Sequence, residues 1–295
     1  MANTIIPAKE YHRIILDIYE KDSITNQLDS QTRQLPTGQQ NPNEILLKKV
    51  QTTSLGDYQR NIGYAAGSAT IGWETVKLEL DRSTFYTLDR VDSIETLNTT
   101  IGDLVADFTR RHLIPEIDAT RLARYANGAG SKKTITLTSV NILSEIDLAS
   151  ATMSNSKVPS AGRLLFVNQE IQPILDAAIP RQWSNEAGLN TNVRIYNGMT
   201  VIYVPGDRFY SGITLNTVSG ASGYNPTIGE NKVNFLMLDP KAVWQAVKVN
   251  VPKFVSADEP TNDLDSHIFR LRIFHDAGVV KVYEKGVYAN LGGTV

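Results

Sequence analysis

The 295-residue chain is predicted to fold as an α+β protein, on three observations. Apolar residues recur at helical spacing over 8–20 and 93–128, residues 48–92 carry the pattern of paired strands, and short strands and helices follow from residue 140 onward. Hydrophobic residues make up 41% of the chain, which is enough for a core at this length. The length predicts one or two domains.

Charge and composition exclude several classes of function. With 29 basic and 31 acidic residues, the net charge of −2 excludes a coat that binds nucleic acid by neutralising phosphates. The absence of cysteine excludes disulfide scaffolds, thiolate metal sites and thiol nucleophiles. No apolar run reaches the length of a membrane span, about 20 residues, and residues 1–10 do not resemble a secretory signal. We therefore expect a soluble protein made in a cytoplasm.

The N-terminal region combines a helix with a polar stretch. Over residues 8–20, Tyr11, Ile14 and Ile18 are spaced to share one face of a short amphipathic helix. Residues 22–43 are polar and interrupted by prolines and a glycine. Such a stretch cannot bury enough apolar surface to order itself. We expect an arm that lies on another surface, for example that of a second copy.

The next region predicts a long β-hairpin. Residues 50–58 and 74–80 have strand patterns, and the intervening segment 61–72 contains three glycines and many small residues. Strands of about nine residues would extend roughly 30 Å. An isolated hairpin is only marginally stable in water. The hairpin is therefore expected to pack on a neighbour, in the same chain or in another subunit.

A long helix is expected over residues 93–128. Its apolar residues are spaced by three and four, and Asp92 or Ser93 can cap its start. Pro115 should kink or restart the helix because proline lacks the backbone N–H. Asn127 and Gly128 are expected to end it in a left-handed conformation.

The remaining elements are short. We expect helices over 141–153 and 169–178 and buried strands over 163–168 and 233–238. A strand hairpin is expected to join 193–196 to 199–204 around Asn197-Gly198, and residues 211–231 are expected to form an exposed loop. Residues 242–249 should be helical or extended, and two final strands over 267–274 and 279–283 should be joined by a turn at 276–278.

The candidate catalytic motifs do not meet the requirements of their chemistry. Residues 127–134 contain Gly, Lys and Ser, but they follow a helix and lack the order of a phosphate-binding loop. The four histidines lack metal-ligand spacing. His275-Asp276 is expected to cap the predicted turn, and His112 to serve packing or capping. No catalytic, cofactor or metal site is expected.

The carboxylates favour ion pairing over catalysis. Asp81 precedes Arg82 and Asp89 precedes Arg90, which suggests ion pairs at a junction between elements. Asp92 and Glu95 lie nearby in the sequence. A pair of carboxylates that cleaves a glycosidic bond remains an alternative, since its spacing is set in space and not in sequence.

An ordered set of segments resembles one family. These segments are 57–60, 63–64, 67, 81–85, 88–89, 91–92, 95–96, 108–111, 114–118, 163–167, 197–202, 235, 240–242, 265, 269–272, 275–276 and 286–288. Together they resemble the major capsid proteins of tailed double-stranded-DNA bacteriophages, which share the Hong Kong 97-type fold. The resemblance covers most of residues 48–290.

The resemblance implies a division of the chain into named parts. Residues 1–47 would be an N-terminal arm, 48–92 an extended loop on an adjacent subunit, and 93–139 the peripheral domain with its spine helix. Residues 140–249 would form the axial domain at five-fold and six-fold centres, and 250–295 would return to the sheet of the peripheral domain. The residues expected at intersubunit contacts are Asp57, Tyr58, Arg60, Tyr64, Trp73, Lys77, Asp81, Arg82, Asp89 and Arg90.

The resemblance also implies a function and partners. The chain would be a non-enzymatic shell protein, without cofactors, that assembles as pentamers and hexamers in the host cytoplasm and encloses double-stranded DNA without reading its sequence. Its location would be the virion capsid. The short N-terminal region leaves no room for a built-in scaffolding segment, so we expect a separate scaffolding protein or a trimmed chain. Portal and decoration proteins are further expected partners. An encapsulin-type nanocompartment shell is the alternative within the fold, and a carboxylate-dependent hydrolase the alternative outside it.

Overall fold

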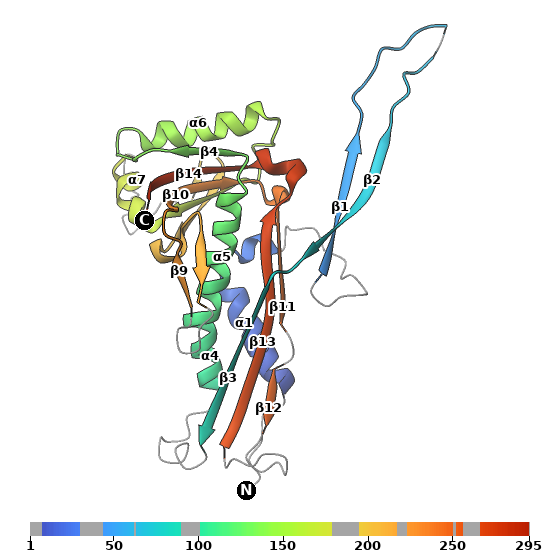
Figure 1. Ribbon diagram of the computed structural model, residues 1–295. Coiled ribbons are helices and arrows are strands. Elements are labelled where there is room, and N and C mark those ends of the chain that lie inside the picture. The colour runs from blue at the N-terminus through green and yellow to red at the C-terminus, as the bar shows by residue number, and fades with distance from the viewer. Residues whose placement is uncertain are drawn as a thin grey trace, which may run out of the picture.

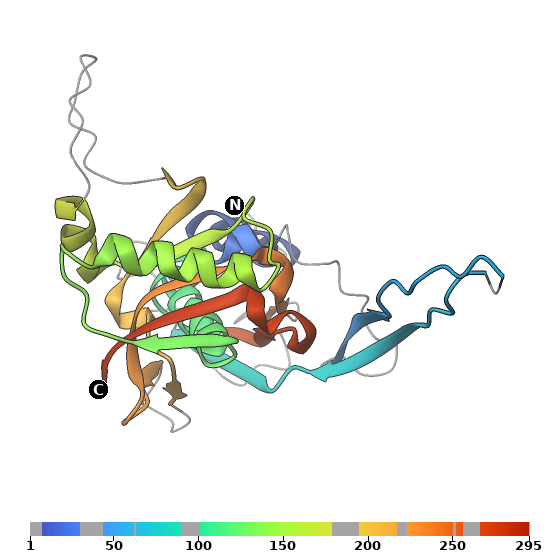
Figure 2. The ribbon, with the colours of Figure 1, turned by 90° about the horizontal axis from the view of Figure 1, so that it is seen from above.

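The computed structural model describes residues 8–29, 44–61, 63–89, 101–178, 195–216, 223–249, 252–255 and 266–294. Two larger sheets share one long helical rod, and a two-stranded hairpin extends from them (Figure 1). Seen from above, the hairpin projects far beyond the rest of the chain (Figure 2). The predicted α+β class is confirmed.

The first sheet has six strands, in the order β4-β14-β10-β5-β7-β6. Their bounds are β4 Ser131–Thr134, β14 Val287–Thr294, β10 Asn231–Leu238, β5 Leu164–Asn168, β7 Met199–Val204 and β6 Ile195–Tyr196. Strands β5 and β7 are parallel, as are β4 and β14, and the other pairs are antiparallel. Every residue of β5 is buried, since helices cover both faces of the sheet.

Helices α6 (Ile142–Asn155) and α7 (Gln172–Ala178), with the 3₁₀ turn η2 (Gln169–Ile171), pack on one face of this sheet. The C-terminal half of α5 (Ile114–Asn127) packs on the other face through Leu122 and Tyr125. The strands predicted over 163–168 and 233–238 are confirmed as β5 and β10. The helices predicted over 141–153 and 169–178 are confirmed as α6 and as η2 with α7. The turn between β6 and β7 is also as expected, because Asn197 and Gly198 have φ of 47° and 77°, the left-handed pair that a tight hairpin requires.

The second sheet is built on the long strand β13 (Ser266–Val279). It pairs with β3 (Leu80–Asp89) along one edge and with β11 (Val243–Val249) and β12 (Lys253–Val255) along the other. Helices α1 (Ala8–Asp22), α4 (Ile101–Phe108) and the first half of α5 cover one face. The core between these layers includes Ile15, Val105, Ile117, Phe269 and Leu271.

Helix α4, the π-helical turn η1 (Thr109–Leu113) and α5 form one continuous rod, which we call the spine rod. Pro115 lacks the N–H that would bond to the carbonyl four residues earlier, and its ring crowds that carbonyl. The rod accommodates Pro115 through the wider π-helical turn η1, in which the N–H of Ile114 donates to the carbonyl of Thr109, five residues earlier. The interruption predicted at Pro115 is therefore a π turn.

The end of the rod differs from expectation. Gly128 has φ of −82°, so the predicted left-handed cap is wrong. Glycine is needed there because of close approach: a Cβ atom would lie 2.8 Å from Cγ2 of Val279 and 3.1 Å from the Arg124 carbonyl oxygen.

The C-terminal strands also differ from expectation. No turn occurs at 276–278, because β11 pairs with this stretch and carries β13 on to Val279. Trp244 lies opposite Gly278, where a Cβ atom would come within 2.9 Å of the indole nitrogen. The predicted strand over 279–283 is mostly the 3₁₀ segment η5 (Lys281–Gly286), and the final strand is β14. Residues 250–295 thus contribute strands to both sheets. The sequence predicted that they contribute only to the peripheral-domain sheet, which is the one built on β13.

The predicted polar arm includes residues that pack on their own chain, so the prediction is wrong for residues 23–29. Residues 23–29 pack on their own chain, where α2 (Asn26–Asp29) buries Leu28 completely. The carboxylate of Asp118, in the spine rod, accepts hydrogen bonds from the Ser23 and Thr25 hydroxyls at 2.8 and 2.7 Å. This buried polar contact, together with the packing of Ile24 and Leu28, holds residues 23–29 on the body of the chain. Residues 30–43 lie outside the described residues.

Smaller elements complete the fold. The predicted loop over 211–231 contains a short hairpin of β8 (Ile213–Leu215) and β9 (Tyr224–Pro226), which descends beside α5. The 3₁₀ turns η3 (Gly206–Arg208) and η4 (Pro240–Ala242) follow β7 and β10.

His275 is buried within β13 and does not cap a turn. Its side chain is 1% exposed and its Nδ1 has no hydrogen-bond partner among the described residues. Burial, with additional repulsion from Arg121 and Arg82, lowers the pKa of His275 to about 3. In the unfolded chain His275 takes up a proton below its ordinary pKa of about 6.5. In the folded chain His275 stays neutral down to a pH of about 3, because burial disfavours the charged imidazolium.

This difference predicts acid lability. As pH falls from about 6.5 towards 3, only the unfolded state gains the proton, so His275 should remove up to about 1.4 kcal/mol of stability per pH unit. Urea unfolding at successive pH values should show this loss, and His275→Leu should flatten the dependence. His112→Leu, at an exposed histidine, is the control and should leave the slope unchanged. Equal slopes for the wild type and His275→Leu would contradict the prediction.

Candidate assembly surfaces

The hairpin of β1 (Glu44–Thr52) and β2 (Ala69–Lys77) is the most exposed part of the described chain. Its strands pair only with each other, in a register that runs from Glu44 opposite Lys77 to Thr52 opposite Ala69. Large apolar side chains are exposed along it: Val50 by 36%, Leu55 by 102%, Tyr58 by 60%, Tyr64 by 92%, Ile71 by 63% and Trp73 by 58%. A two-stranded sheet with this much exposed apolar surface needs a partner.

The tip of the hairpin, residues 53–68, has its own local order. Gln59 and Gly63 exchange backbone hydrogen bonds of 3.2 and 2.7 Å. This small loop places the rings of Tyr58 and Tyr64 edge to face, with centroids 5.2 Å apart. Asp57 and Arg60 are exposed beside them. Four predicted contact residues thus lie together at the tip.

The base of the hairpin is anchored to the second sheet. Ile45 and Leu78, each 2% exposed, pack with Trp244 and Phe274. The backbone N–H of Glu79 donates to the carboxylate of Asp276 at 3.2 Å, while Arg124 bonds to the Glu79 carboxylate at 2.7 Å. Apolar packing and polar contacts together set the direction in which the hairpin leaves the body of the protein.

The predicted contact residues in β2 and β3 fall into two groups. Trp73 and Lys77 are exposed on β2. Asp81 and Arg82 belong to β3, where they form the ion pairs that the sequence suggested. The Asp81 carboxylate accepts two hydrogen bonds from Arg272, at 2.9 and 2.5 Å, and these lower its pKa.

Arg82 connects three elements. Its guanidinium bonds to both oxygens of Glu116 in the spine rod, at 2.6 and 3.1 Å, and to the Asn216 carbonyl after β8, at 2.8 Å. Asp89 ends β3 opposite Ser266. Arg90, Asp92 and Glu95 lie outside the described residues. The structure therefore separates Asp81, Arg82 and Asp89 from the residues at the hairpin tip.

Three exposed apolar residues of the hairpin, Val50, Leu55 and Ile71, were not predicted as contacts. Ile71 lies two residues before Trp73, on the same side of β2, so the period-two pattern of a strand could have identified it. Leu55 has no such neighbour, and its exposure follows only from the structure.

Neither a metal-binding cluster nor a membrane-spanning helix occurs among the described residues. Among them no group of three or more histidine, aspartate or glutamate side chains is placed to hold a metal ion. No helix in the described part of the chain is long and apolar enough to span a membrane.

Comparisons with known proteins identify solved structures with a similar fold. No protein-family model and no curated protein matches the chain. The mature capsid of bacteriophage PhiM1 matches with a TM-score of 0.64 and 10% identity, over 91% of this chain and 87% of that chain. A structure from Mycobacterium phage Che8 matches with a TM-score of 0.56 and 14% identity over 84% of each chain.

A virus-like particle from Pyrococcus furiosus also matches, with a TM-score of 0.54 and 9% identity over 96% of this chain and 98% of that chain. Each of these matches covers at least 84% of this chain. The chain thus has the Hong Kong 97-type fold of tailed-phage capsid proteins.

Proposed function

We propose that this chain is a non-enzymatic shell subunit, which assembles into a closed icosahedral capsid around a phage genome. The observation that carries the proposal is the projecting hairpin, which exposes Tyr64, Ile71 and Trp73 on a fold similar to that of capsid subunits. In a shell these side chains are covered by neighbouring copies. Obligate interfaces of this kind bury roughly 2,000–5,000 Å².

In this proposal each part of the fold has a place in the shell. The β1–β2 hairpin is the extended loop that lies on an adjacent subunit. The six-stranded sheet with α6 and α7 forms the axial domain, at the centres of pentamers and hexamers. The spine rod, α1 and the sheet of β13 form the peripheral domain. Exposed residues of the hairpin make intersubunit contacts, and Asp81 and Arg82 form ion pairs within the subunit.

The proposal includes partners and a location. The shell is assembled in the bacterial cytoplasm, with a separate scaffolding protein, a portal and decoration proteins, and becomes the virion capsid. The enclosed double-stranded DNA is not read by sequence. A net charge of −2 supports this, because such a subunit does not neutralise phosphates in bulk.

Electron microscopy of the purified protein, expressed alone and with its scaffolding protein, tests the proposal. We expect closed particles with five-fold and six-fold clusters of subunits. Size-exclusion chromatography should show the protein eluting far above its subunit mass of 32.6 kDa. A chain that stays monomeric under both conditions would overturn the proposal.

The similarity to a virus-like particle from Pyrococcus furiosus favours one alternative, an encapsulin-type shell that holds a protein cargo. The contents of the particles distinguish the two. Nuclease-protected DNA supports the phage capsid, and a co-purifying enzyme supports the encapsulin.

A further inference from the structure

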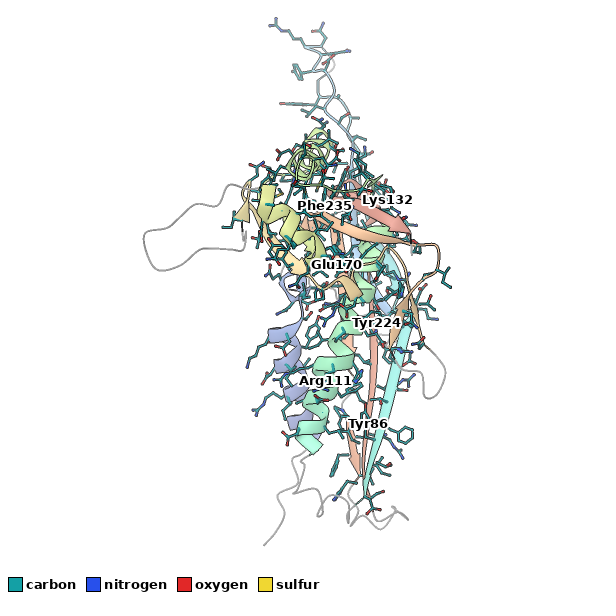
Figure 3. The ribbon with its side chains drawn as sticks, turned by 90° about the vertical axis from the view of Figure 1, so that its left-hand side faces the viewer. Tyr86, Arg111, Lys132, Glu170, Tyr224 and Phe235 are labelled. Carbon is teal, nitrogen blue, oxygen red and sulfur yellow. The ribbon has the colours of Figure 1, made fainter. Side chains whose placement is uncertain are left out.

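A cavity of about 140 Å³ lies between β3, β13 and the spine rod. Tyr86 of β3, labelled in Figure 3, lines it together with Phe108 and His112 of the rod. An apolar cavity of about 150 Å³ in another protein accommodates benzene. The cavity in this chain is therefore the size of one aromatic ring.

The walls of the cavity suit an aromatic guest. The rings of Tyr86 and Phe108 meet edge to face with centroids 5.6 Å apart, and the Phe108 and His112 rings lie 5.9 Å apart. Leu271 of β13 adds an apolar surface. Rings favour edge-to-face and offset contacts with other rings, so a further ring would extend this cluster.

The rim of the cavity is polar. Arg82 and Glu116 line it, joined by their ion pair, and both side chains are partly exposed, by 23% and 13%. A guanidinium and a carboxylate can bond respectively to the oxygen and the hydrogen of a hydroxyl group. The cavity therefore matches a phenol better than a purely apolar ring.

The chain also carries a phenol ring, that of Tyr64, which is not buried within its own subunit. Tyr64 is 92% exposed at the hairpin tip, in contact with the ring of Tyr58. The reciprocal bonds between Gln59 and Gly63 hold this pair in position before any partner binds. Such preorganisation reduces the entropy lost on docking.

We propose that Tyr64 of one copy inserts into the cavity beside Arg82 and Glu116 of a neighbouring copy. The inference rests on the proposed shell function and adds to it the receptor site for the hairpin tip. Tyr58 supports the inserted ring from behind. The ion pair of Arg82 thereby serves two purposes, joining elements within its own subunit and forming the polar rim for the neighbour.

Substitution of Tyr64 tests the hairpin side of the contact. Tyr64→Ala should raise the subunit concentration needed for assembly about tenfold or more, because a buried aromatic side chain contributes that much to affinity. Tyr64→Phe should recover most of the loss. The control is Tyr283→Ala, a tyrosine 42% exposed on η5, which should assemble normally. Unchanged assembly of Tyr64→Ala would overturn the contact.

Crosslinking tests the cavity side of the contact. The chain has no native cysteine, so only the introduced cysteines can react with the crosslinker. Tyr64→Cys combined with Ser83→Cys, at the cavity rim, should yield covalent oligomers with a short bismaleimide. The matched pair, Tyr64→Cys with Leu148→Cys on the exposed face of α6, should give only the background of each single variant. Equal yields from the two pairs would overturn the proposed site.

These results separate the two proposals. If the wild type forms no particles, the shell function fails and the contact fails with it. If the wild type forms particles and Tyr64→Ala assembles equally well, only the contact is wrong. Circular dichroism of each variant shows that the subunit itself has folded.

Discussion

Replacing residues 53–68 with an Asn-Gly turn should abolish shell assembly while leaving the subunit folded. Thr52 and Ala69 are paired, so a two-residue turn can join them without changing the register. The described residues of the removed segment contribute nothing to the buried core, and Leu55 and Tyr64 are almost fully exposed. Their role is therefore expected only between copies. Electron microscopy should show no shells, and thermal unfolding should give a midpoint close to that of the wild type.

The control for this variant removes exposed apolar surface elsewhere. Ile228 is 92% exposed before β10, and Ile228→Ser should assemble normally. Normal shells from the shortened hairpin would show that the hairpin does not connect subunits. A collapse of the melting transition would show instead that the tip stabilises its own chain.

Asp118→Ala should be the most destabilising single substitution on the spine rod. Asp118 is 0% exposed and accepts four hydrogen bonds from residues 23–25, from the Ser23 and Thr25 hydroxyls and the Ile24 and Thr25 N–H groups. Arg208 lies 3.7 Å away. Alanine would leave these donors buried without their acceptor. Loss of one partner from a buried charged network costs about 3–5 kcal/mol, which urea unfolding would measure.

The buried Arg121 extends this network. It donates to the hydroxyls of Tyr19 and Thr25, at 2.5 and 2.8 Å, so Asp118 and Arg121, two buried charged residues of the rod, together hold the N-terminal segment. We therefore expect Asp118→Ala to release residues 23–29, with faster hydrogen exchange there than in β5.

The control for Asp118 is another aspartate of the same rod. Asp107 is 56% exposed and pairs with Arg111 one turn later, at 2.8 Å. Exposed pairs at this spacing contribute about 0.3–0.5 kcal/mol, so Asp107→Ala should have little effect. Equal losses from the two substitutions would contradict the assignment of Asp118 as the anchor.

Several elements of this fold were predictable from local periodicity alone. The apolar spacing of α1 and α6, the continuous apolar runs of β5 and β10 and the left-handed turn at Asn197-Gly198 all follow from side chains close together in the chain. A hairpin is also predicted in this region, but its strands are expected at 50–58 and 74–80, whereas the structure has them at 44–52 and 69–77 because the cross-strand register pairs Thr52 with Ala69. Tyr58, Tyr64 and Trp73 were expected contacts from the resemblance to capsid proteins, and the structure shows that all three are exposed.

Other features depend on contacts between residues far apart in the sequence and could not be predicted from local patterns. Pairing with β11 carries β13 through Asp276 and Gly278, where the local pattern predicts a turn. Asp118 anchors residues 23–29, about 90 positions earlier, which local composition assigns to a polar arm. Likewise, the cavity beside Arg82 forms only where β3, β13 and the spine rod meet. Local composition predicts local conformation, but strand pairing and buried polar contacts depend on which distant residues the fold brings together.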